Sequence, residues 1–279
     1  MAPPDDTPSP PPTDEEIWRS YDSIEQRLTA PVSERMLDLA ALRPGMRVLD
    51  LASGRGEPAI RAAHRVGPRG TVVGVDASPG VLQIARERAA REGLSNLRFR
   101  TASVESLDGI PLDYFDRTLA RWGLMYLDSA TTALLAARRA MVADGLLVAA
   151  VWAEPERVPY FTVPRRILAK HASLPPIDFD RPGTFHYAES ARLHRDLAAA
   201  GFVVEHEEEQ HVAVIEAATG SEIVAWTRAV VLGRLLDGLP KETQEAWEAD
   251  VLQELEAFRD DGFIRLGGVT RIVSARVAG

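Results

Sequence analysis

Short apolar runs alternate with amphipathic segments through the middle of the chain. The apolar runs have the length of buried strands and span residues 47–52, 70–78, 96–103, 115–123 and 146–153. Between them, apolar residues recur at three- and four-residue steps, which predicts helices over residues 57–66, 79–93 and 129–145. Strands and helices that alternate in this way form a parallel sheet with right-handed crossovers and helices on both faces. We therefore expect an α/β protein with an open, doubly wound sheet.

The segments on either side of this region follow other patterns. Six prolines among small and acidic residues predict an extended, mobile tail over residues 1–13. A helix is expected from Thr13 or Asp14, with an interruption at Pro31 and a second helix over residues 32–42. The C-terminal part predicts, in order, a helix over 191–201, strands over 202–207 and 211–216, helical segments over about 220–237 and 241–259, and a closing strand over 268–278.

These elements suggest one domain over residues 14–279 behind the tail. Residues 14–44 are expected to form an N-terminal helical lid, and residues 45–152 the ligand-binding core. Two stretches, 153–190 and 217–260, are long connections late in the sheet. We expect them to be insertions that form a substrate lid over the ends of the strands.

Composition and charge exclude several classes of function. Hydrophobic residues make up 46% and charged residues 26% of the 279 residues, as in globular domains. The net charge of -9 disfavours nucleic acid as a partner, and the absence of cysteine excludes disulfides and thiolate metal ligands. The six histidines lack the spacing of a helical zinc motif, so no metal is expected. No signal peptide or membrane span is visible, which fits a cytoplasmic monomer or homodimer.

The candidate ligand site is a glycine turn in "VLDLASGRGEPAI", residues 48–60. Gly54, Gly56 and Ala59 fit the pattern G-x-G-x-x-G/A, which alone is a weak signal for a nucleotide site. In doubly wound sheets the turn after the first strand lies where ligands bind. A pyrophosphate at the following helix would be repelled by Asp50, which ends the strand, whereas an ammonium group would be attracted. Asp50 can equally be a turn acid that only bonds nearby N–H groups.

A second acid narrows the choice of ligand. Asp76 ends the second strand, twenty residues after Gly56, where a carboxylate can accept both hydroxyls of a ribose. A nucleoside with a cationic amino-acid part and no phosphate would satisfy both Asp50 and Asp76. S-adenosylmethionine is such a molecule.

Several motifs in order resemble the class I S-adenosylmethionine-dependent methyltransferases, of the small-molecule kind that is similar to the quinone-biosynthesis methyltransferases. The motifs are "RVLDLASGRGEPA", "GTVVGVDASPGVLQIARERA", "FDRTLARWGLMYL" and "GLLVAAVWAEPE". The resemblance covers about residues 14–279, and its specific part is residues 46–152. It implies a Rossmann-like methyltransferase fold with a seven-stranded sheet and S-adenosylmethionine as the cofactor.

The resemblance also implies roles for individual residues. The methionine part of the cofactor would contact Ala52, Ser53 and Gly54, with Asp50 toward its ammonium group. Asp76 would hold the ribose hydroxyls, and Ala77 and Val81 would flank the adenine. The remaining residues expected at the cofactor are Gly56, Ser103, Val104, Arg121 and Tyr21. Ser103 and Val104 stand where the family usually has an acid that meets the adenine amino group. Arg55 replaces a small residue, and it is either a solvated turn residue or a contact to a carboxylate.

Ala52 is a further departure from the family pattern. It stands where glycine is common, and alanine is tolerated there if the local φ is negative.

Aromatic residues gather after the fourth and fifth strands and in the first insertion. They are expected either to wall an apolar substrate cavity or to be core residues. The candidates for the substrate site are Trp18, Trp122, Met125, Tyr160 and Phe185, and the other members of the group are Tyr21, Tyr126, Trp152, Phe161 and Tyr187.

The expected activity is methyl transfer to an O or C atom of a small, largely apolar molecule such as a phenol, quinol, polyketide or terpenoid. This points to secondary metabolism. Phenols and enols need a general base, and His186 in the first insertion is the catalytic candidate, with His171 as a weaker rival and a packing role as the alternative. Two other functions remain open: a nicotinamide-dependent oxidoreductase on the same glycine turn, and a non-catalytic module that binds the cofactor.

Overall fold

The structure is a computed structural model that describes residues 14–278, with side chains from residue 23 onward except that of Arg234. The tail predicted over residues 1–13 lies outside the described residues. The side chains of Trp18 and Tyr21 do as well, although their backbone is part of the first helix.

A single twisted sheet forms the centre of the molecule. Its strands are β1 (Arg47–Leu51), β2 (Thr71–Asp76), β3 (Leu97–Thr101), β4 (Phe115–Arg121), β5 (Met141–Trp152), β6 (Phe202–Ala217), β7 (Arg259–Asp260) and β8 (Phe263–Val277). The order is β3-β2-β1-β4-β5-β8-β6, with the two-residue β7 paired to β8 off this path. The first five strands are parallel, and β8 runs antiparallel to both β5 and β6. The mostly parallel, doubly wound sheet with a path of seven strands confirms the predicted fold class.

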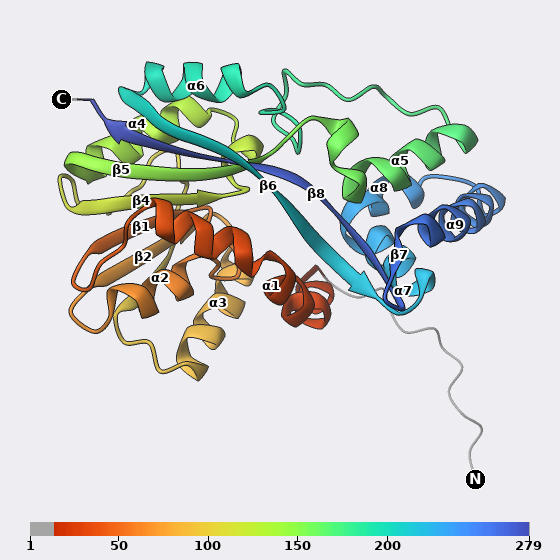
Figure 1. Cartoon of the computed structure of the whole chain (residues 1–279), viewed down its shortest axis with the longest axis horizontal. Helices are drawn as coiled ribbons and strands as arrows, with labels where there is room; N and C mark the ends of the chain where they lie inside the picture. The colour runs from red at the N-terminus through yellow and green to blue at the C-terminus, as the bar shows by residue number, and fades with distance from the viewer. Residues whose placement is uncertain (1–13, 279) are drawn as a thin grey trace, which may run out of the picture.

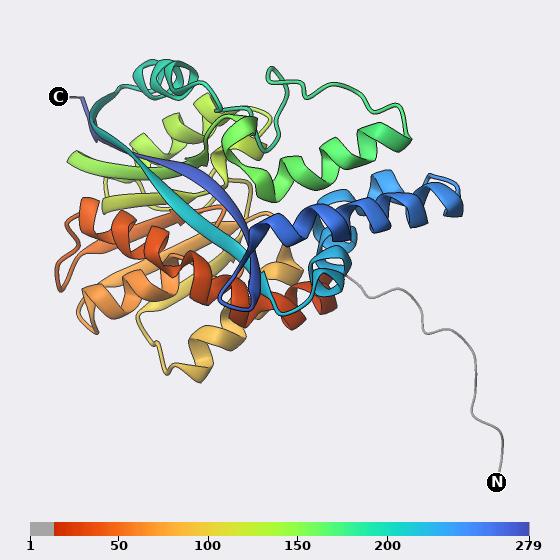
Figure 2. The same ribbon diagram turned by 45° about the vertical axis from the view of Figure 1, so that its right-hand side comes forward.

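Helices cover both faces of the sheet. α1 (Asp14–Leu39), α2 (Ala59–Val66) and α3 (Pro79–Arg91) lie on one face, and α4 (Ala130–Ala140) and α6 (Ser190–Ala199) on the other (Figures 1 and 2). β1 and most of β5 are buried because both of their faces are covered. Parallel strands end at one edge of the sheet, so the segments after β1, β2, β4 and β5 meet there.

The two predicted insertions form one group of helices beside the sheet. The first contributes α5 (Pro159–His171), and the second contributes α7 (Gly220–Trp226), a π-helical turn (Thr227–Leu232), α8 (Gly233–Leu236) and α9 (Lys241–Leu255). α9 packs against both α5 and α7. In Figure 1 the long strands β6 and β8 run from the sheet to this group, and their far ends carry α7 and β7.

Three predicted element boundaries are wrong. α1 continues through Pro31 as one helix, because residues beyond the proline are buried and hold its second half in place. The fifth strand begins at Met141, whose backbone pairs with Phe115, where a helix to residue 145 was expected. The two short strands expected over 202–216 are one strand, because β8 pairs with it along its whole length.

Candidate cofactor site

The glycine turn between β1 and α2 exposes its backbone at one glycine and packs closely at another. Gly54 has a φ of 50°, and a Cβ there would meet no atom within 4 Å. Gly56 has a φ of 96°, and a Cβ there would lie 2.9 Å from Cδ1 of Ile60. Gly54 therefore leaves room for a ligand against the main chain, whereas Gly56 allows the turn to close onto α2.

Ala52 adopts a left-handed conformation that glycine would adopt without strain. Its φ is +53°, so the expected condition of a negative φ is wrong. A Cβ at Gly123 would lie 2.5 Å from the Cβ of Ala52. The missing side chain of Gly123 thus makes room for the alanine, at a conformational cost of about 1–2 kcal/mol at Ala52.

The two predicted acids lie at the ends of neighbouring strands. Asp50 is fully buried, and its Oδ2 accepts a hydrogen bond from the Ala59 N–H at the start of α2, 3.1 Å away. Its Oδ1 has no hydrogen-bond partner among the described residues. Burial raises the pKa of Asp50 well above its ordinary value, although the positive charge of Arg121 opposes this. Asp50 is therefore a turn acid that also has one oxygen left for a cation.

Asp76 bridges the glycine turn and the start of α3. Its Oδ2 accepts the Gly54 N–H and its Oδ1 accepts the Ser78 N–H, each at 2.9 Å. Because each carboxylate oxygen has two lone pairs, both oxygens can still accept a ligand hydroxyl.

A cavity of about 240 Å³ lies between this turn, α1 and the end of β4. Its lining residues are Glu25, Gln26, Ala52, Ser53, Gly54, Arg55, Glu57, Val81, Arg88, Arg121 and Trp122. We call it the glycine-turn cavity. Two of its lining groups, Ser53 Oγ and Arg121 Nε, are buried with no hydrogen-bond partner among the described residues. Such groups suit a polar ligand, because a buried donor or acceptor without a partner is costly.

Arginines and glutamates from four elements surround the cavity. Arg88 of α3 is buried and donates to the Arg55 carbonyl at 2.6 Å and to Glu57 at 3.0 Å. Arg55 forms an ion pair with Glu25 of α1, so it does contact a carboxylate. Arg121 donates to Thr29 Oγ1 of α1 at 2.8 Å, and burial lowers its pKa against the charges of Glu57 and Asp50.

The structure brings only some of the predicted cofactor residues into this cavity. Ala52, Ser53, Gly54, Val81 and Arg121 line it. Those that do not line it are Asp50, Gly56, Asp76, Ala77, Ser103 and Val104.

The last three of these residues follow β2 and β3. Ala77 and Ser103 are exposed, and Val104 is buried. Ser103 Oγ accepts the Glu105 N–H at 3.1 Å.

Sequence reasoning missed Glu25, Gln26 and Arg88. No motif includes them. The sequence pattern of α3 gives no sign that Arg88 is buried, and its partners, Arg55 and Glu57, lie in the glycine turn.

Aromatic residues connect the cavity to the first insertion. Trp122 lines the cavity and stacks on Trp152, with ring centroids 4.6 Å apart and planes 8° apart. Phe161 of α5 meets Trp152 edge-on at 5.7 Å, and Phe185 meets Phe161 at 6.1 Å. These four residues form a continuous aromatic wall. Thr270 of β8 fixes its first member, because its hydroxyl accepts the Trp122 indole N–H at 2.9 Å.

The other predicted substrate residues differ in their placement. Met125 is fully buried, as a core residue would be. Tyr126 is half exposed, and its hydroxyl bonds Thr184 of the insertion at 3.1 Å. Tyr160 is buried in the first turn of α5 and is bonded to Trp226.

His186 faces a second cavity. Its Nδ1 donates to the carbonyls of Phe179 and Arg181, at 3.1 and 3.2 Å. The second cavity measures about 360 Å³, and none of its lining residues lines the glycine-turn cavity. His171 of α5 is partly buried and pairs with Asp250 of α9 at 2.9 Å, and it lines neither of these two cavities.

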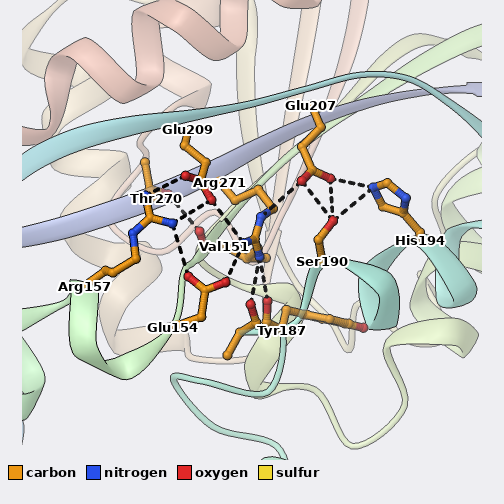
Figure 3. A network of polar contacts seen from close by, with 11 residues as sticks. Val151, Glu154, Arg157, Tyr187, Ser190, His194, Glu207, Glu209, Thr270 and Arg271 are labelled. Atoms are coloured by element: carbon orange, nitrogen blue, oxygen red, sulfur yellow. Dashed lines mark hydrogen bonds and ion pairs between the residues drawn. The ribbon is translucent and has the colours of Figure 1, made fainter.

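A buried arginine that the sequence did not reveal fastens the first insertion to the sheet (Figure 3). Arg271 of β8 is 3% exposed, and its Nη1 donates to the carbonyls of Tyr187 and Ala188 at 3.2 and 3.0 Å. Its other nitrogens lie 3.1–3.2 Å from three carboxylates, those of Glu154, Glu207 and Glu209. The carbonyls that it binds follow closely after Phe185, so this network holds one end of the aromatic wall.

Two features are absent from the described part of the chain. No helix there is long and apolar enough to cross a membrane. No three histidine or acidic side chains within it converge as a metal site would require.

Comparison with known proteins identifies the family. Residues 42–160 match the model of a methyltransferase domain. The chain is 34% identical over 125 residues to aklanonic acid methyltransferase DauC of Streptomyces sp. strain C5, which is 45% of this chain and 56% of the relative. It is 32% identical over 179 residues to the ubiquinone/menaquinone biosynthesis C-methyltransferase UbiE of Edwardsiella ictaluri, covering 60% of this chain and 70% of that protein.

A solved structure agrees in fold. The S-adenosylmethionine-dependent methyltransferase of Aquifex aeolicus superposes with a TM-score of 0.58 over 95% of this chain and 99% of its own, at 16% identity. The chain belongs to the class I S-adenosylmethionine-dependent methyltransferases.

The cofactor is S-adenosylmethionine, which decides against a nicotinamide cofactor on this turn. The site is compatible with it: Gly54 leaves its backbone open, and both oxygens of Asp76 beside it can still accept hydrogen bonds from hydroxyl groups. Ser53, Arg121 and the free oxygen of Asp50 offer a donor and acceptor set for an amino acid.

Proposed function

We propose that this protein transfers the methyl group of S-adenosylmethionine to an oxygen or carbon atom of a small, largely apolar acceptor. The observation that carries the proposal is the aromatic wall, because Trp122 belongs both to the glycine-turn cavity and to this wall. A flat acceptor against the wall would lie next to the methyl donor. Phenols, quinols and polyketide-like rings have the required shape and polarity.

The names of the relatives support this class of acceptor. One is a C-methyltransferase of ubiquinone and menaquinone biosynthesis, and the other is named for aklanonic acid. The aligned region spans little more than half of the second protein, so its substrate is a guide to chemistry and not to identity.

The chemistry asks mainly for positioning. The cofactor supplies an activated methyl group, and this chain's residues orient the acceptor and exclude water. Alignment of two reactants in this way can supply about 7–11 kcal/mol of the barrier. The buried aromatic residues Trp152, Tyr160 and Phe185 offer a dry, rigid surface for it.

A screen by mass spectrometry tests the proposal. The protein is incubated with S-adenosylmethionine and a panel of phenols, naphthols and hydroquinones, and each product is examined for the added mass of one CH₂ unit. We expect methylation of bicyclic or larger rings before single rings, because they cover more of the wall. Binding of S-adenosylmethionine without methylation of any member would favour a non-catalytic module instead.

His186 remains the candidate base for acceptors that must lose a proton. If it has this role, His186→Gln lowers turnover of a phenol by roughly 10²- to 10⁴-fold, because glutamine can hydrogen-bond but cannot take up the proton. Affinity for S-adenosylmethionine should not change. His171→Gln is the control, since His171 pairs with Asp250 and lines neither cavity. A His186→Gln variant as fast as wild type would mean that positioning alone supports the transfer.

A further inference from the structure

Tyr160 carries a buried hydroxyl next to the aromatic wall. The residue lies in the first turn of α5, which follows β5, and it is 5% exposed. Its ring meets Phe161 edge-on, with centroids 4.5 Å apart. Since Phe161 contacts Trp152, the tyrosine is continuous with the surface that leads to the glycine-turn cavity.

The hydroxyl of Tyr160 accepts a hydrogen bond but donates none to the side chains that the structure describes. The indole N–H of Trp226 donates to this oxygen at 2.6 Å. An indole nitrogen can only donate, so the tyrosine proton must go elsewhere. No acceptor for it is found in residues 23–278, Arg234 aside. A buried hydroxyl proton without an acceptor is unfavourable, and a ligand oxygen would remove that cost.

The electrostatic neighbours of the hydroxyl indicate where it lies. Burial raises the pKa of Tyr160, the Trp226 hydrogen bond opposes this, Tyr126 raises the pKa slightly and Arg55 lowers it. Arg55 lines the glycine-turn cavity, and Tyr126 follows the end of β4. Burial is the largest of these influences on the hydroxyl. It stays protonated near neutral pH, which suits a hydrogen-bond donor and not a base.

We propose that Tyr160 is a specificity-determining residue that donates a hydrogen bond to an oxygen of the acceptor, and that Trp226 holds its hydroxyl in the donating orientation. Donation from the indole polarises the tyrosine O–H and strengthens the bond that it makes. The ligand class is a flat, largely apolar ring system with a carbonyl or phenolic oxygen on its edge. The inference rests on the proposed function for the statement that this ligand is the methyl acceptor.

A pair of probes that differ in one oxygen tests the role of Tyr160. 1-Tetralone has a carbonyl that only accepts hydrogen bonds, and tetralin is the same bicycle without it. Affinity for each is measured by calorimetry with the full chain saturated with S-adenosylhomocysteine. We expect Tyr160→Phe to weaken tetralone binding by about 3- to 10-fold, as for one neutral hydrogen bond, and to leave tetralin unchanged.

Matched variants separate this bond from a general loss of structure. Tyr114→Phe removes a hydroxyl from a half-buried tyrosine that packs on Phe115. It should leave tetralone affinity within about twofold. Trp226→Phe should reproduce part of the Tyr160→Phe loss. Trp247→Phe, which removes another buried indole donor, bonded to the Pro164 carbonyl, should not.

The outcomes also separate this inference from the proposed function. Equal affinity of wild type and Tyr160→Phe for tetralone, equal losses for both probes, or no binding of tetralone to wild type would overturn the inference while methylation could still be observed. Weaker binding of S-adenosylhomocysteine by Tyr160→Phe would assign the hydroxyl to the cofactor instead, and would also overturn it. A different outcome would be that Tyr160→Phe weakens the binding of tetralone but not of tetralin, while the wild type methylates no member of the panel. This would support the proposed hydrogen bond of Tyr160 and refute only the proposed methyl transfer.

Discussion

Asp50 is a carboxyl group with one oxygen bonded to the start of α2 and the other without a partner among the described residues. Because burial raises its pKa, the folded protein resists ionisation of Asp50. The unfolded chain ionises this group near pH 3.9. The stability that the protonated form contributes is therefore fully present below that pH and is lost as the pH rises through the folded-state pKa.

Asp50→Asn should remove this loss of stability at higher pH, because asparagine does not ionise. We expect the free energy of unfolding of the variant, relative to wild type, to rise between about pH 4 and pH 7. On the hypothesis that Asp50 faces the ammonium group of S-adenosylmethionine, the affinity for this cofactor should fall by about tenfold or more, because asparagine carries no negative charge. Denaturant titrations at several pH values and calorimetry at pH 7 measure the two effects. If the free energy of unfolding changes with pH in the same way in the two proteins, the pKa of Asp50 does not differ between the folded and the unfolded state.

Asp76 has a different role, since it is only partly buried and both of its oxygens accept backbone N–H groups. Asp76→Ala should weaken S-adenosylmethionine binding by about 2 kcal/mol, or about thirtyfold, because bonds to a charged group are lost. Asp108→Ala, which removes an exposed acid, is the control. Unchanged affinity of the Asp76 variant in calorimetry would remove this residue from the cofactor site.

Residue types at this site could be predicted from the sequence, whereas residue conformations could not. Asp50 and Asp76 end two neighbouring strands, and the glycines follow the first of them. The motif was therefore enough to predict that these residues lie close together. Ala52 and Trp122 have positive φ values, and the room for the Ala52 side chain comes from Gly123, which follows another strand. Arg88 was missed for the same reason, because its partners come from the turn and not from its own helix.

At the scale of elements, β8 connects the cofactor site to the first insertion through two consecutive residues. Thr270 holds the indole of Trp122, and Arg271 holds the carbonyls that follow Phe185. One strand therefore fixes both ends of the aromatic wall. The sequence predicted a strand here but not this function, because it shows no partner for either side chain.

Arg271→Met should be strongly destabilising. It leaves three carboxylates close together without their buried cation, and the loss of one partner from such a network typically costs about 3–5 kcal/mol. In the folded variant, the KM for the acceptor should rise more than the Kd for S-adenosylmethionine, because only the wall is loosened.

Arg157→Met is the matched control for Arg271. Arg157 pairs with two of the same acids but is 42% exposed, so its loss should cost less than about 1 kcal/mol. Denaturant unfolding compares the two variants. Similar costs for both would show that burial of Arg271 is not what makes it important.

Element boundaries were predicted well where a local signal ends the element and poorly where pairing decides it. Ser78 and Pro79 mark the start of α3, and Ser129 marks that of α4. The proline at residue 31 signals a break that packing of the flanking turns prevents. The unbroken length of β6 depends on β8, which is more than forty residues away along the chain.

At the scale of the whole molecule, α1 joins two parts of the protein. Its second half packs against β6 and holds most of the buried side chains among residues 23–39, namely Val32, Ser33, Met36 and Leu37. Its first half reaches the glycine-turn cavity, which Glu25 and Gln26 line and where Glu25 pairs with Arg55. We therefore expect the second half of this helix to support stability and its first half to support ligand binding.

Two truncations should separate these halves. Deletion of residues 1–12 should change neither turnover nor the free energy of unfolding, because six prolines among small and acidic residues offer no apolar pattern that could pack. Deletion of residues 1–30 also removes Glu25 and Thr29, the partners of Arg55 and Arg121. Thr29 is the only fully buried side chain between residues 23 and 30, so these eight residues contribute little to the packing of the core.

The longer deletion should therefore lower turnover and cofactor affinity by about tenfold or more, while the unfolding midpoint moves little. Turnover is followed by mass spectrometry with the best acceptor of the panel, cofactor affinity by calorimetry, and stability by denaturant unfolding. Equal loss of turnover in both truncations would place a function in residues 1–12. A collapse of stability together with activity in the longer one would mean that the first half of α1 is part of the core, and that the cavity depends on it only through folding.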